Sequence, residues 1–276
     1  SEQEARKEVL DMLEIYNSVG RDLLAIPFVQ GKKTDKEKFA GAEETYTIEA
    51  LMHDGKALQS GTTHYFGTGF ASHFNITFQD KDSLVKPVHQ TSWGLSTRLI
   101  GAVIMVHGDD SGLVLPPYLA PTQVVIVCIQ SQNTLVIEAA NKIQAELEKL
   151  QVRVKIDDSD RSPGWKFAES EMKGIPLRIE VGPRDLEQGE VVIVKRLNRE
   201  KNKVALSTAA SQIPQMLEDI HHQMYQNALK NLQANTRNAH SYEDFKSIIQ
   251  NEGGFKIGTH PTPKSWFTIE EHHQSE

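Results

Sequence analysis

Cysteine is almost missing from this chain of 276 residues, because Cys128 is the only one. A single cysteine cannot form a disulfide within the chain, and it cannot supply the cysteine cage of a structural zinc site. The sequence therefore predicts no zinc site. A chain without disulfides is typical of a reducing compartment, and we expect a cytoplasmic protein.

Long hydrophobic runs and an excess of positive charge are missing as well. No apolar run approaches the roughly 20 residues that cross a bilayer, and the first residues are too polar for a secretory signal, so no membrane association is expected. Asp and Glu outnumber Lys and Arg by 37 to 30, which gives a formal net charge of −7. This charge argues against general binding of polyanions, although a local basic surface remains compatible with it.

The common short motifs of phosphate and metal binding are also missing. The chain contains no GxxxxGK[ST] or GxGxxG segment and no HExxH or HxxEH pattern. The lysine-rich run from Lys32 to Lys38 is interrupted by Asp35 and Glu37, which is typical of a solvated loop.

The first half of the chain has the pattern of an antiparallel α+β fold. Apolar residues at helical spacing predict a helix that ends at Gly20. A second helix is predicted around Arg98, with Leu95, Leu99 and Val106 on one face. The predicted strands are 23–29, 45–52, 57–67 and 76–80, and residues 53–56 (HDGK) predict a hairpin turn between the second and the third.

The second half has the pattern of an α/β fold. Pro116, Pro117 and Pro121 predict an extended connector before it. Strands are predicted at 123–129, 152–157, 175–181 and 190–197, and helices at 134–150, 162–174 and 213–229. In the first of these helices the apolar face is predicted to contain Leu135, Ala139, Ile143, Leu147 and Leu150. The polar tail from about Gly253 is predicted to be poorly ordered.

Two sets of residues in the first half are candidates for chemistry. Arg98 stands near a Trp93-Gly94 pair, so it is either a surface arginine on an apolar helix or a planar cation that stacks on a base or grips a phosphate. Thr62 and His64 share one face of a strand, where they either orient a polar ligand or are simply solvated. Glu49 on the neighbouring strand has the same two interpretations.

The second half places Glu171, Arg178, Arg184 and Asp185 around one helix end, one strand and the following turn. Arginine and carboxylate pairs read base edges, which are accessible in unpaired RNA. Trp165 and Phe167 are either stacking platforms or core residues.

Several segments, taken in order, resemble prolyl-tRNA synthetases of the archaeal and eukaryotic-like form, which are class II aminoacyl-tRNA synthetases. The segments are EKFAGA (37–42), TYTIEALM (45–52), ALQSGTTHYFG (57–67), SWGLSTRLIGAVIMVHGDDSGLVLPP (92–117), LAPTQVVIV (119–127) and PGWKFAESEMKGIPLRIEVGPRDLEQGEVV (163–192). The similarity extends to about Gly254, and the fourth segment resembles class II motif 3 in its prolyl form.

The resemblance implies a fold and its division into domains. Residues 1–118 are expected to be the C-terminal part of a class II catalytic domain with an antiparallel sheet, and residues 119–233 an α/β anticodon-binding domain. Residues 234–276 are expected to begin a C-terminal extension with a diverged, poorly ordered tail.

The resemblance also implies a reaction. L-proline is activated with ATP and Mg²⁺ to prolyl-adenylate and then transferred to tRNA(Pro). Arg98 is the implied catalytic residue, which stacks on the adenine and contacts the terminal phosphate of ATP. Gln59 and Thr62 are implied to bind ATP with it. The implied proline-binding residues are Phe39, His64, Trp93 and Gly94.

For the second domain the resemblance implies anticodon recognition. The positions that read the two guanines shared by proline anticodons correspond here to Glu171, Arg178, Arg184 and Asp185, with Phe167 nearby.

Two motifs of the family are not found in this sequence: motif 1, which forms the dimer interface, and motif 2, whose arginine grips the α-phosphate. We therefore expect an internal piece of a normally homodimeric synthetase, without the motif 1 interface and inactive on its own. A non-catalytic tRNA-binding paralogue is an alternative, as is a class IIa synthetase for threonine, histidine or glycine. The segments SWGLSTR and ALQSGTTH favour the prolyl form.

Overall fold

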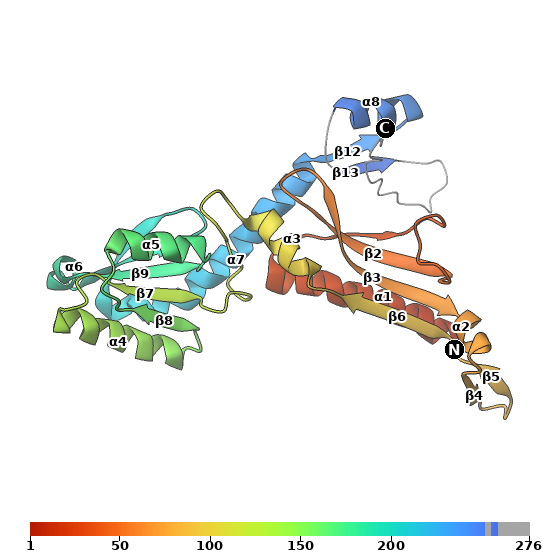
Figure 1. Cartoon of the computed structure of the whole chain (residues 1–276), viewed down its shortest axis with the longest axis horizontal. Coiled ribbons are helices and arrows are strands. Elements are labelled where there is room, and N and C mark those ends of the chain that lie inside the picture. Colours follow the sequence, from red (N-terminus) through yellow and green to blue (C-terminus); the bar gives the residue numbers. More distant parts are fainter. Residues whose placement is uncertain (252–254, 259–276) are drawn as a thin grey trace. The chain divides into compact units, whose positions relative to one another are not determined.

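Two compact units make up the part of the chain that the computed structural model describes, which is residues 1–251 and 255–258 (Figure 1). Unit 1 comprises Ser1–Arg21, Ile26–Val106 and the described residues from Ala228 onward, and unit 2 comprises Asp22–Ala25 and His107–Asn227. The tail predicted to be poorly ordered lies outside the described residues, apart from the short strand β13. The domain boundaries expected from the sequence stay predictions.

An antiparallel sheet in the order β1-β2-β3-β6 forms the centre of unit 1. Its strands are β1 (Val29–Lys32), β2 (Glu44–Leu51), β3 (Ala57–Gly67) and β6 (Gln90–Leu95). Helix α1 (Glu2–Val19) lies along one face of this sheet, where Ala5 and Val9 pack against the buried Tyr65 (Figure 1). Ser1 and Glu4 form a capping box, which satisfies donors of the first turn of α1.

The predicted hairpin between β2 and β3 is confirmed. The N–H of Met52 donates to the carbonyl of Lys56 at 2.9 Å, and the side chain of Asp54 accepts from the N–H of Lys56 at 3.1 Å. Gly55 adopts a φ of +79°, a conformation that favours glycine. A bulge between Ile48 and Glu49 shifts the register of β2 against β3.

The strand predicted over 23–29 is wrong. Helix α1 continues directly into a π-helical turn (η1, Gly20–Leu24), and β1 begins only at Val29. Gly20 permits this path because the ring of Phe28 packs where a side chain would start: a Cβ on Gly20 would lie 2.3 Å from Cδ2 of Phe28. Apolar composition alone did not separate the end of this turn and the buried residues 24–28 from a strand.

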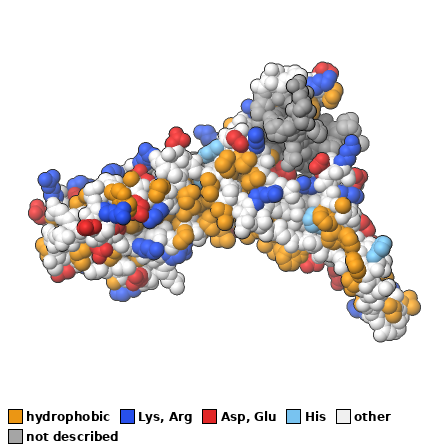
Figure 2. All heavy atoms as spheres, in the orientation of Figure 1, with side chains coloured by type: hydrophobic (Ala, Val, Ile, Leu, Met, Phe, Trp, Pro, Cys, Tyr) orange, Lys and Arg blue, Asp and Glu red, His pale blue; other side chains and the backbone are white. Residues whose placement is uncertain are grey.

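Smaller elements complete the strand-rich part of unit 1. They are α2 (Gly69–His73), the two-stranded ribbon of β4 (Thr77–Gln79) and β5 (Val85–Pro87), and α3 (Arg98–His107). The ribbon confirms a strand near the predicted 76–80. Its apolar side chains Phe78, Leu84 and Val85 are exposed, and orange side chains are visible there (Figure 2).

A five-stranded mixed sheet in the order β11-β10-β9-β7-β8 forms the centre of unit 2. Its strands are β7 (Val124–Cys128), β8 (Val154–Asp157), β9 (Leu177–Val181), β10 (Glu190–Lys195) and β11 (Lys201–Ala205). Strand β7 runs parallel to β8 and β9, whereas β10 runs antiparallel to β9 and β11. The two sheets confirm the predicted fold class, an antiparallel α+β part followed by an α/β part.

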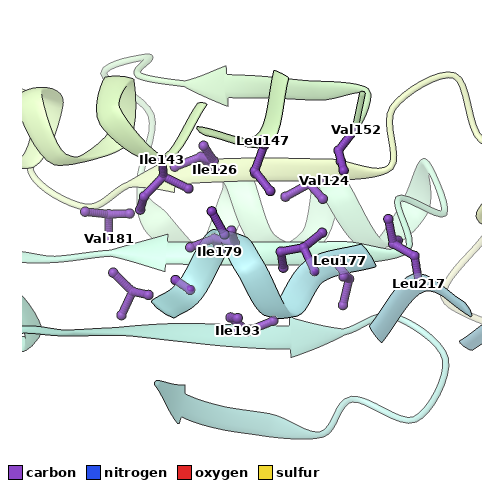
Figure 3. Close-up of a cluster of buried hydrophobic side chains, with 14 of the residues drawn as sticks. Val124, Ile126, Ile143, Leu147, Val152, Leu177, Ile179, Val181, Ile193 and Leu217 are labelled. Atoms are coloured by element: carbon purple, nitrogen blue, oxygen red, sulfur yellow. The ribbon is translucent and has the colours of Figure 1, made fainter. Parts of the chain in front are cut away.

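The helices of unit 2 and one continuous hydrophobic core hold this sheet. The helices are α4 (Thr134–Lys149), α5 (Pro163–Met172), α6 (Pro183–Glu187), the 3₁₀ turn η2 (Leu206–Thr208) and α7 (Ala209–Ala234), whose last turns belong to unit 1. The core joins side chains of β7, β9 and β10 to those of α4 and α7, including Ile126, Ile143, Leu147, Ile179 and Leu217 (Figure 3).

The predicted apolar face of α4 is partly wrong. Ile143 and Leu147 are buried as expected, but Val136 and Ala140 accompany them, while Leu135 is 68% exposed and Leu150 is 46% exposed. At the start of α4, the buried face is therefore shifted by about one residue from the predicted apolar face.

Beyond α7 the described chain adds β12 (Thr236–Ala239), α8 (Tyr242–Asn251) and β13 (Phe255–Gly258), and β12 pairs with β13 in parallel. Within the described residues, no helix combines the length and the hydropathy that a membrane span requires.

Candidate functional site

A band of polar side chains crosses the face of the unit 1 sheet that is opposite to α1. Thr62 and His64 are two residues apart on β3, so their side chains point to the same face of the sheet. The register places Thr62 beside Thr47 of β2 and His64 beside Thr45. Residues directly opposite each other on paired strands share a face, so these four side chains lie together. The predicted pairing of Thr62 with His64 is thus present in the structure.

Hydrogen bonds fix the His64 ring at both nitrogens. Nδ1 lies 3.0 Å from the hydroxyl of Thr45, and Nε2 lies 3.1 Å from the hydroxyl of Thr62. The ring of Phe39 packs against it with centroids 5.1 Å apart, and the N–H of Phe39 donates to the hydroxyl of Thr45 at 3.1 Å. Burial lowers the pKa of His64, and the positive charge of Lys33 lowers it further, so both favour the neutral form of the ring.

Arg98 begins α3 and is tied to β3. Its Nη1 donates to the carbonyl of Gln59 at 3.1 Å, while Lys33 donates to the side-chain oxygen of Gln59 at 2.8 Å. Two cations therefore contact Gln59, one through its backbone and one through its amide. Glu49 lies across from Gln59 in the register and is 6% exposed. The interpretation of Glu49 as a solvated surface residue is therefore wrong.

Trp93 and Gly94 do not act as a pair on this face. In the β3–β6 register, Gly94 lies opposite Thr62, but Trp93 lies opposite Thr63. Side chains alternate between faces, so the Trp93 indole leaves from the α1 side, away from His64. The expectation that Trp93 and His64 border one pocket is therefore corrected, whereas Gly94 lies beside Thr62 on the face of His64.

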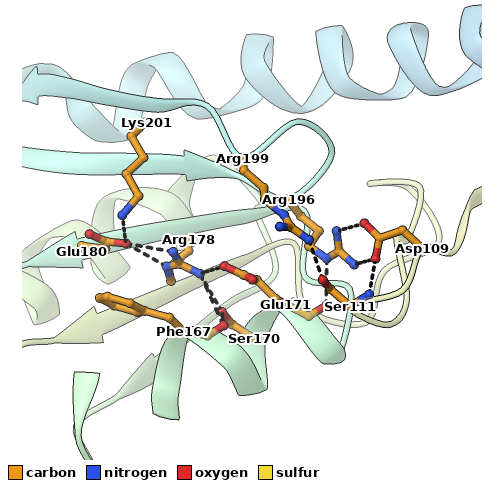
Figure 4. Close-up of polar contacts among 10 residues, drawn as sticks. All are labelled: Asp109, Ser111, Phe167, Ser170, Glu171, Arg178, Glu180, Arg196, Arg199 and Lys201. Carbon is orange, nitrogen blue, oxygen red and sulfur yellow. Dashed lines mark hydrogen bonds and ion pairs between the residues drawn. The ribbon is translucent and has the colours of Figure 1, made fainter. Parts of the chain in front are cut away.

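Arg178 is the centre of a second cluster, in unit 2 (Figure 4). Its Nε and Nη2 contact one carboxylate oxygen of Glu180 at 3.0 and 2.9 Å, and its Nη1 contacts the carboxylate of Glu171 at 3.0 Å. Nη1 also reaches the hydroxyl of Ser170 at 3.2 Å. The Arg178 side chain is 6% exposed, while that of Glu171 is 28% exposed. Arg178 thus holds Glu171 at the surface rather than reaching the solvent itself.

Phe167 lies beside this cluster. The guanidinium of Arg178 stacks over its ring at 4.3 Å from the centroid, and Nζ of Lys201 lies 5.7 Å from the same centroid. Lys201 also pairs with Glu180 at 3.7 Å. Phe167, Glu171 and Arg178 are therefore brought together as expected.

Asp185 and Arg184 differ from each other. Asp185, in α6, pairs with Lys203 of β11 at 2.9 Å, close along the strand to Lys201. Arg184 is exposed, and no contact within the described residues brings it to the Arg178 cluster. The structure thus joins Asp185 to the same edge of the sheet but leaves Arg184 apart.

Trp165 lies on the other side of α5, against a hollow of about 380 Å³ between α5 and β8. It is 40% exposed, with the guanidinium of Arg161 at 3.6 Å from its ring centroid. The interpretation of Trp165 as a core residue is therefore wrong.

The residues that sequence reasoning missed are those that act as partners of the predicted ones. They are Lys33, Thr45, Glu180, Lys201 and Lys203. Alternation along β9 was the available signal for Glu180, since it lies two residues after Arg178 on the same face. The others became visible only through strand pairing.

Residues 123–216 match the family model of the anticodon binding domain. Over 253 residues, or 92% of its length, the chain is 55% identical to a proline–tRNA ligase of Phytoplasma australiense. It is 54% identical over 253 residues to that of Lachnoclostridium phytofermentans, and 51% identical over 255 residues to that of Clostridium botulinum, each match covering 92% of this chain. The chain is homologous to the proline–tRNA ligases. It spans 53% of the length of each of these relatives.

This homology confirms the resemblance to prolyl-tRNA synthetases, and the matched domain coincides with the sheet that carries the Arg178 cluster.

Proposed function

We propose that this chain carries two working parts of a proline–tRNA ligase: the ATP- and proline-binding part in unit 1, and an anticodon-reading part in unit 2. Identity of 51–55% to proline–tRNA ligases across 92% of the chain supports the prolyl reaction over the threonyl, histidyl or glycyl one. The observation that carries the anticodon part is the buried Arg178, which presents the Glu171 carboxylate at the surface.

The reaction proposed for the whole enzyme has two steps. An oxygen of the proline carboxylate attacks the α-phosphorus of ATP in line, a P–O bond forms, and pyrophosphate leaves. A terminal ribose hydroxyl of tRNA(Pro) then attacks the prolyl carbonyl, and AMP leaves. Negative charge develops on the phosphate oxygens in the first step, and fixed cations lower its energy.

In unit 1 the residues would divide the two ligands between them. Arg98 would stack on the adenine and contact the terminal phosphate, with Gln59 and Thr62 beside the nucleotide. His64, Phe39 and Gly94 would border the proline ring. Gly94 suits this position because, apart from its chain neighbours, no described residue comes within 4 Å of where its Cβ would be, so a ligand can approach its backbone. Trp93 would contribute only its backbone on this face.

Mg²⁺ accompanies ATP in this proposal. Among the described residues, no group of three or more His, Cys, Asp or Glu side chains lies close enough together to hold a metal ion. We derive no step through Mg²⁺.

In unit 2 the carboxylate of Glu171 would read guanine. The Watson–Crick edge of guanine offers two N–H donors side by side, and a carboxylate accepts both. Arg178 orients the Glu171 carboxylate through its contact at 3.0 Å. Phe167 offers a ring on which an unstacked base can lie. Lys201, Lys203 and Arg184 would contact the RNA backbone.

The test is binding of a proline anticodon stem-loop RNA to this chain at fixed salt. The intact RNA is expected to bind at least tenfold more tightly than one whose two anticodon guanines are replaced by adenines, since a bidentate pair is worth about 1–3 kcal/mol. Glu171→Gln should remove most of that preference. The control is Glu169→Gln, which changes a carboxylate of the same helix that pairs with Lys173 instead.

Equal binding of the two RNAs by the folded wild-type chain would overturn the anticodon part of the proposal. The homodimer and the cytoplasmic location stay predictions.

A further inference from the structure

In the chain of hydrogen bonds around His64, the donor and the acceptor of each bond can be assigned. The N–H of Phe39 can only donate, so the hydroxyl of Thr45 accepts from it at 3.1 Å. The same hydroxyl lies 3.0 Å from Nδ1 of His64. Thr45 is 1% exposed, so water does not reach it.

The hydroxyl proton of Thr45 has one place to go. Within the described residues, Nδ1 of His64 is the partner that remains for it after the N–H of Phe39. If Nδ1 carried a hydrogen, the Thr45 proton would be buried without an acceptor, which costs about 1–3 kcal/mol. Thr45 therefore donates to Nδ1, and Nδ1 is an acceptor.

The second nitrogen must then carry the hydrogen of the neutral ring. Nε2–H donates to the hydroxyl of Thr62 at 3.1 Å. A doubly protonated ring would leave the Thr45 proton without its acceptor, and it would also bring a second positive charge near Lys33. The other groups against the ring, Phe39 and Phe66, carry no charge that would favour it.

The hydroxyl of Thr62 receives a hydrogen bond from His64, so its own proton is available. Thr62 is half-buried and lies on the open face of β3, opposite Gly94. A hydroxyl that already accepts a hydrogen bond is polarised into a better donor.

We propose that Thr45 is a positioning residue that fixes His64 as the Nε2–H tautomer, so that Thr62 offers a hydroxyl proton to an acceptor oxygen on the ligand. The nature of that ligand rests on the function proposed above: a ribose, phosphate or carboxylate oxygen of ATP or proline. The tautomer itself does not rest on it. Thr45 touches neither ligand and acts through His64.

The tautomer is measured directly by nitrogen-15 NMR of the chain labelled in histidine, using two-bond couplings within each ring. The signals of His64 are identified among the 11 histidines by their loss in His64→Gln. The wild type is expected to show the Nε2–H pattern at pH 7, and Thr45→Ser should keep it because the hydroxyl remains. Thr45→Val should convert the ring to a mixture or to Nδ1–H, and it should raise the pKa of His64 because the neutral form loses its donor.

Thr47→Val is the matched control. It removes another buried hydroxyl from the same strand, one that contacts the carbonyl of Gly61 at 3.3 Å and not His64, and the His64 pattern should not change. An Nδ1–H pattern in the wild type overturns the proposal even if the valine variant does not fold. An unchanged pattern in a folded Thr45→Val variant overturns it as well. Both NMR measurements are made without ATP or proline. A failure of the proposed function would instead appear as a lack of ATP or proline binding, so the two failures can be told apart.

Discussion

The side chain of Arg178 is 6% exposed and places its guanidinium between two carboxylates, and the side chain of Glu180 is 9% exposed. In Arg178→Met, the one charged partner left to Glu180 among the described residues is Lys201, at 3.7 Å, so its buried charge is poorly compensated. We expect unit 2 to lose about 3 kcal/mol of unfolding free energy, the usual result of removing one partner of a buried ion pair. Urea unfolding of the chain, followed by circular dichroism, measures this loss.

The double variant Arg178→Met, Glu180→Met should recover much of that stability, because both buried charges are then removed. Arg184→Met is the matched control, since Arg184 is exposed and should change stability by less than about 0.5 kcal/mol. A single Arg178 variant as stable as this control would show that the cluster does not hold unit 2 together.

Single residues also mark how far the sequence could predict the site. The sequence indicates Phe167, Glu171 and Arg178 by their residue types and placement and again by the resemblance, and the structure brings them together. Trp93 was placed wrongly because its face depends on the register of β6 against β3, which one residue of shift inverts. Thr45 could not be found, because its role exists only through pairing with β3.

At the scale of elements, the loop after α3 is fastened to the end of β10. Asp109 forms a bidentate pair with Arg196, with oxygen–nitrogen distances of 2.8 and 2.6 Å, and Arg196 also donates to the carbonyl of Glu171 (Figure 4). Hydrogen bonds from Arg196 lower the pKa of Asp109 from 3.8 to about 2. The folded state therefore binds this proton less readily than the unfolded state.

This linkage predicts a pH dependence. The contribution of Asp109 should be fully present above about pH 4 and should be lost as the pH falls through about 2. Asp109→Asn should reduce the unfolding free energy at pH 6 by roughly 1 kcal/mol, a figure that allows for solvent screening of a side chain that is 41% exposed. The gap between wild type and variant should close as the pH approaches 2.

The neighbouring Asp110→Asn is the control for Asp109→Asn, because it removes an adjacent exposed carboxylate without touching Arg196. A constant gap from pH 6 to pH 2, or an equal effect of the two variants, would contradict the assignment of this linkage to the Asp109–Arg196 pair.

The types of most elements followed from periodicity, but two details did not. Residues 135–140 of α4 are nearly all apolar, so the sequence does not decide whether the stripe begins at Leu135 or Val136; the sheet beneath decides it. The π-helical turn at Gly20–Leu24 depends on Phe28 packing against Gly20, a contact that no local pattern encodes.

At the scale of the whole chain, the hydrophobic side chains form separate clusters. The core of unit 2 joins Ala25 to residues between Val114 and Met224, and a second cluster joins Ala5, Val9 and Tyr65 in unit 1. Residues that pack in the same core unfold together. Two separate cores therefore predict two unfolding transitions in urea rather than one.

Two substitutions test this division. Leu147→Ala removes a fully buried side chain from the core of unit 2, and Ile48→Ala does the same in the sheet of unit 1. Each should lower the midpoint of one transition by the equivalent of about 2–5 kcal/mol and leave the other in place. The chain has three tryptophans, so Trp266 is replaced by phenylalanine together with either Trp93 or Trp165. Tryptophan fluorescence then reports the units one at a time, since Trp93 lies in unit 1 and Trp165 in unit 2. If either alanine variant moved both transitions equally, the two units would be folding as one, and the anticodon-reading part could not be treated as a domain with a stability of its own.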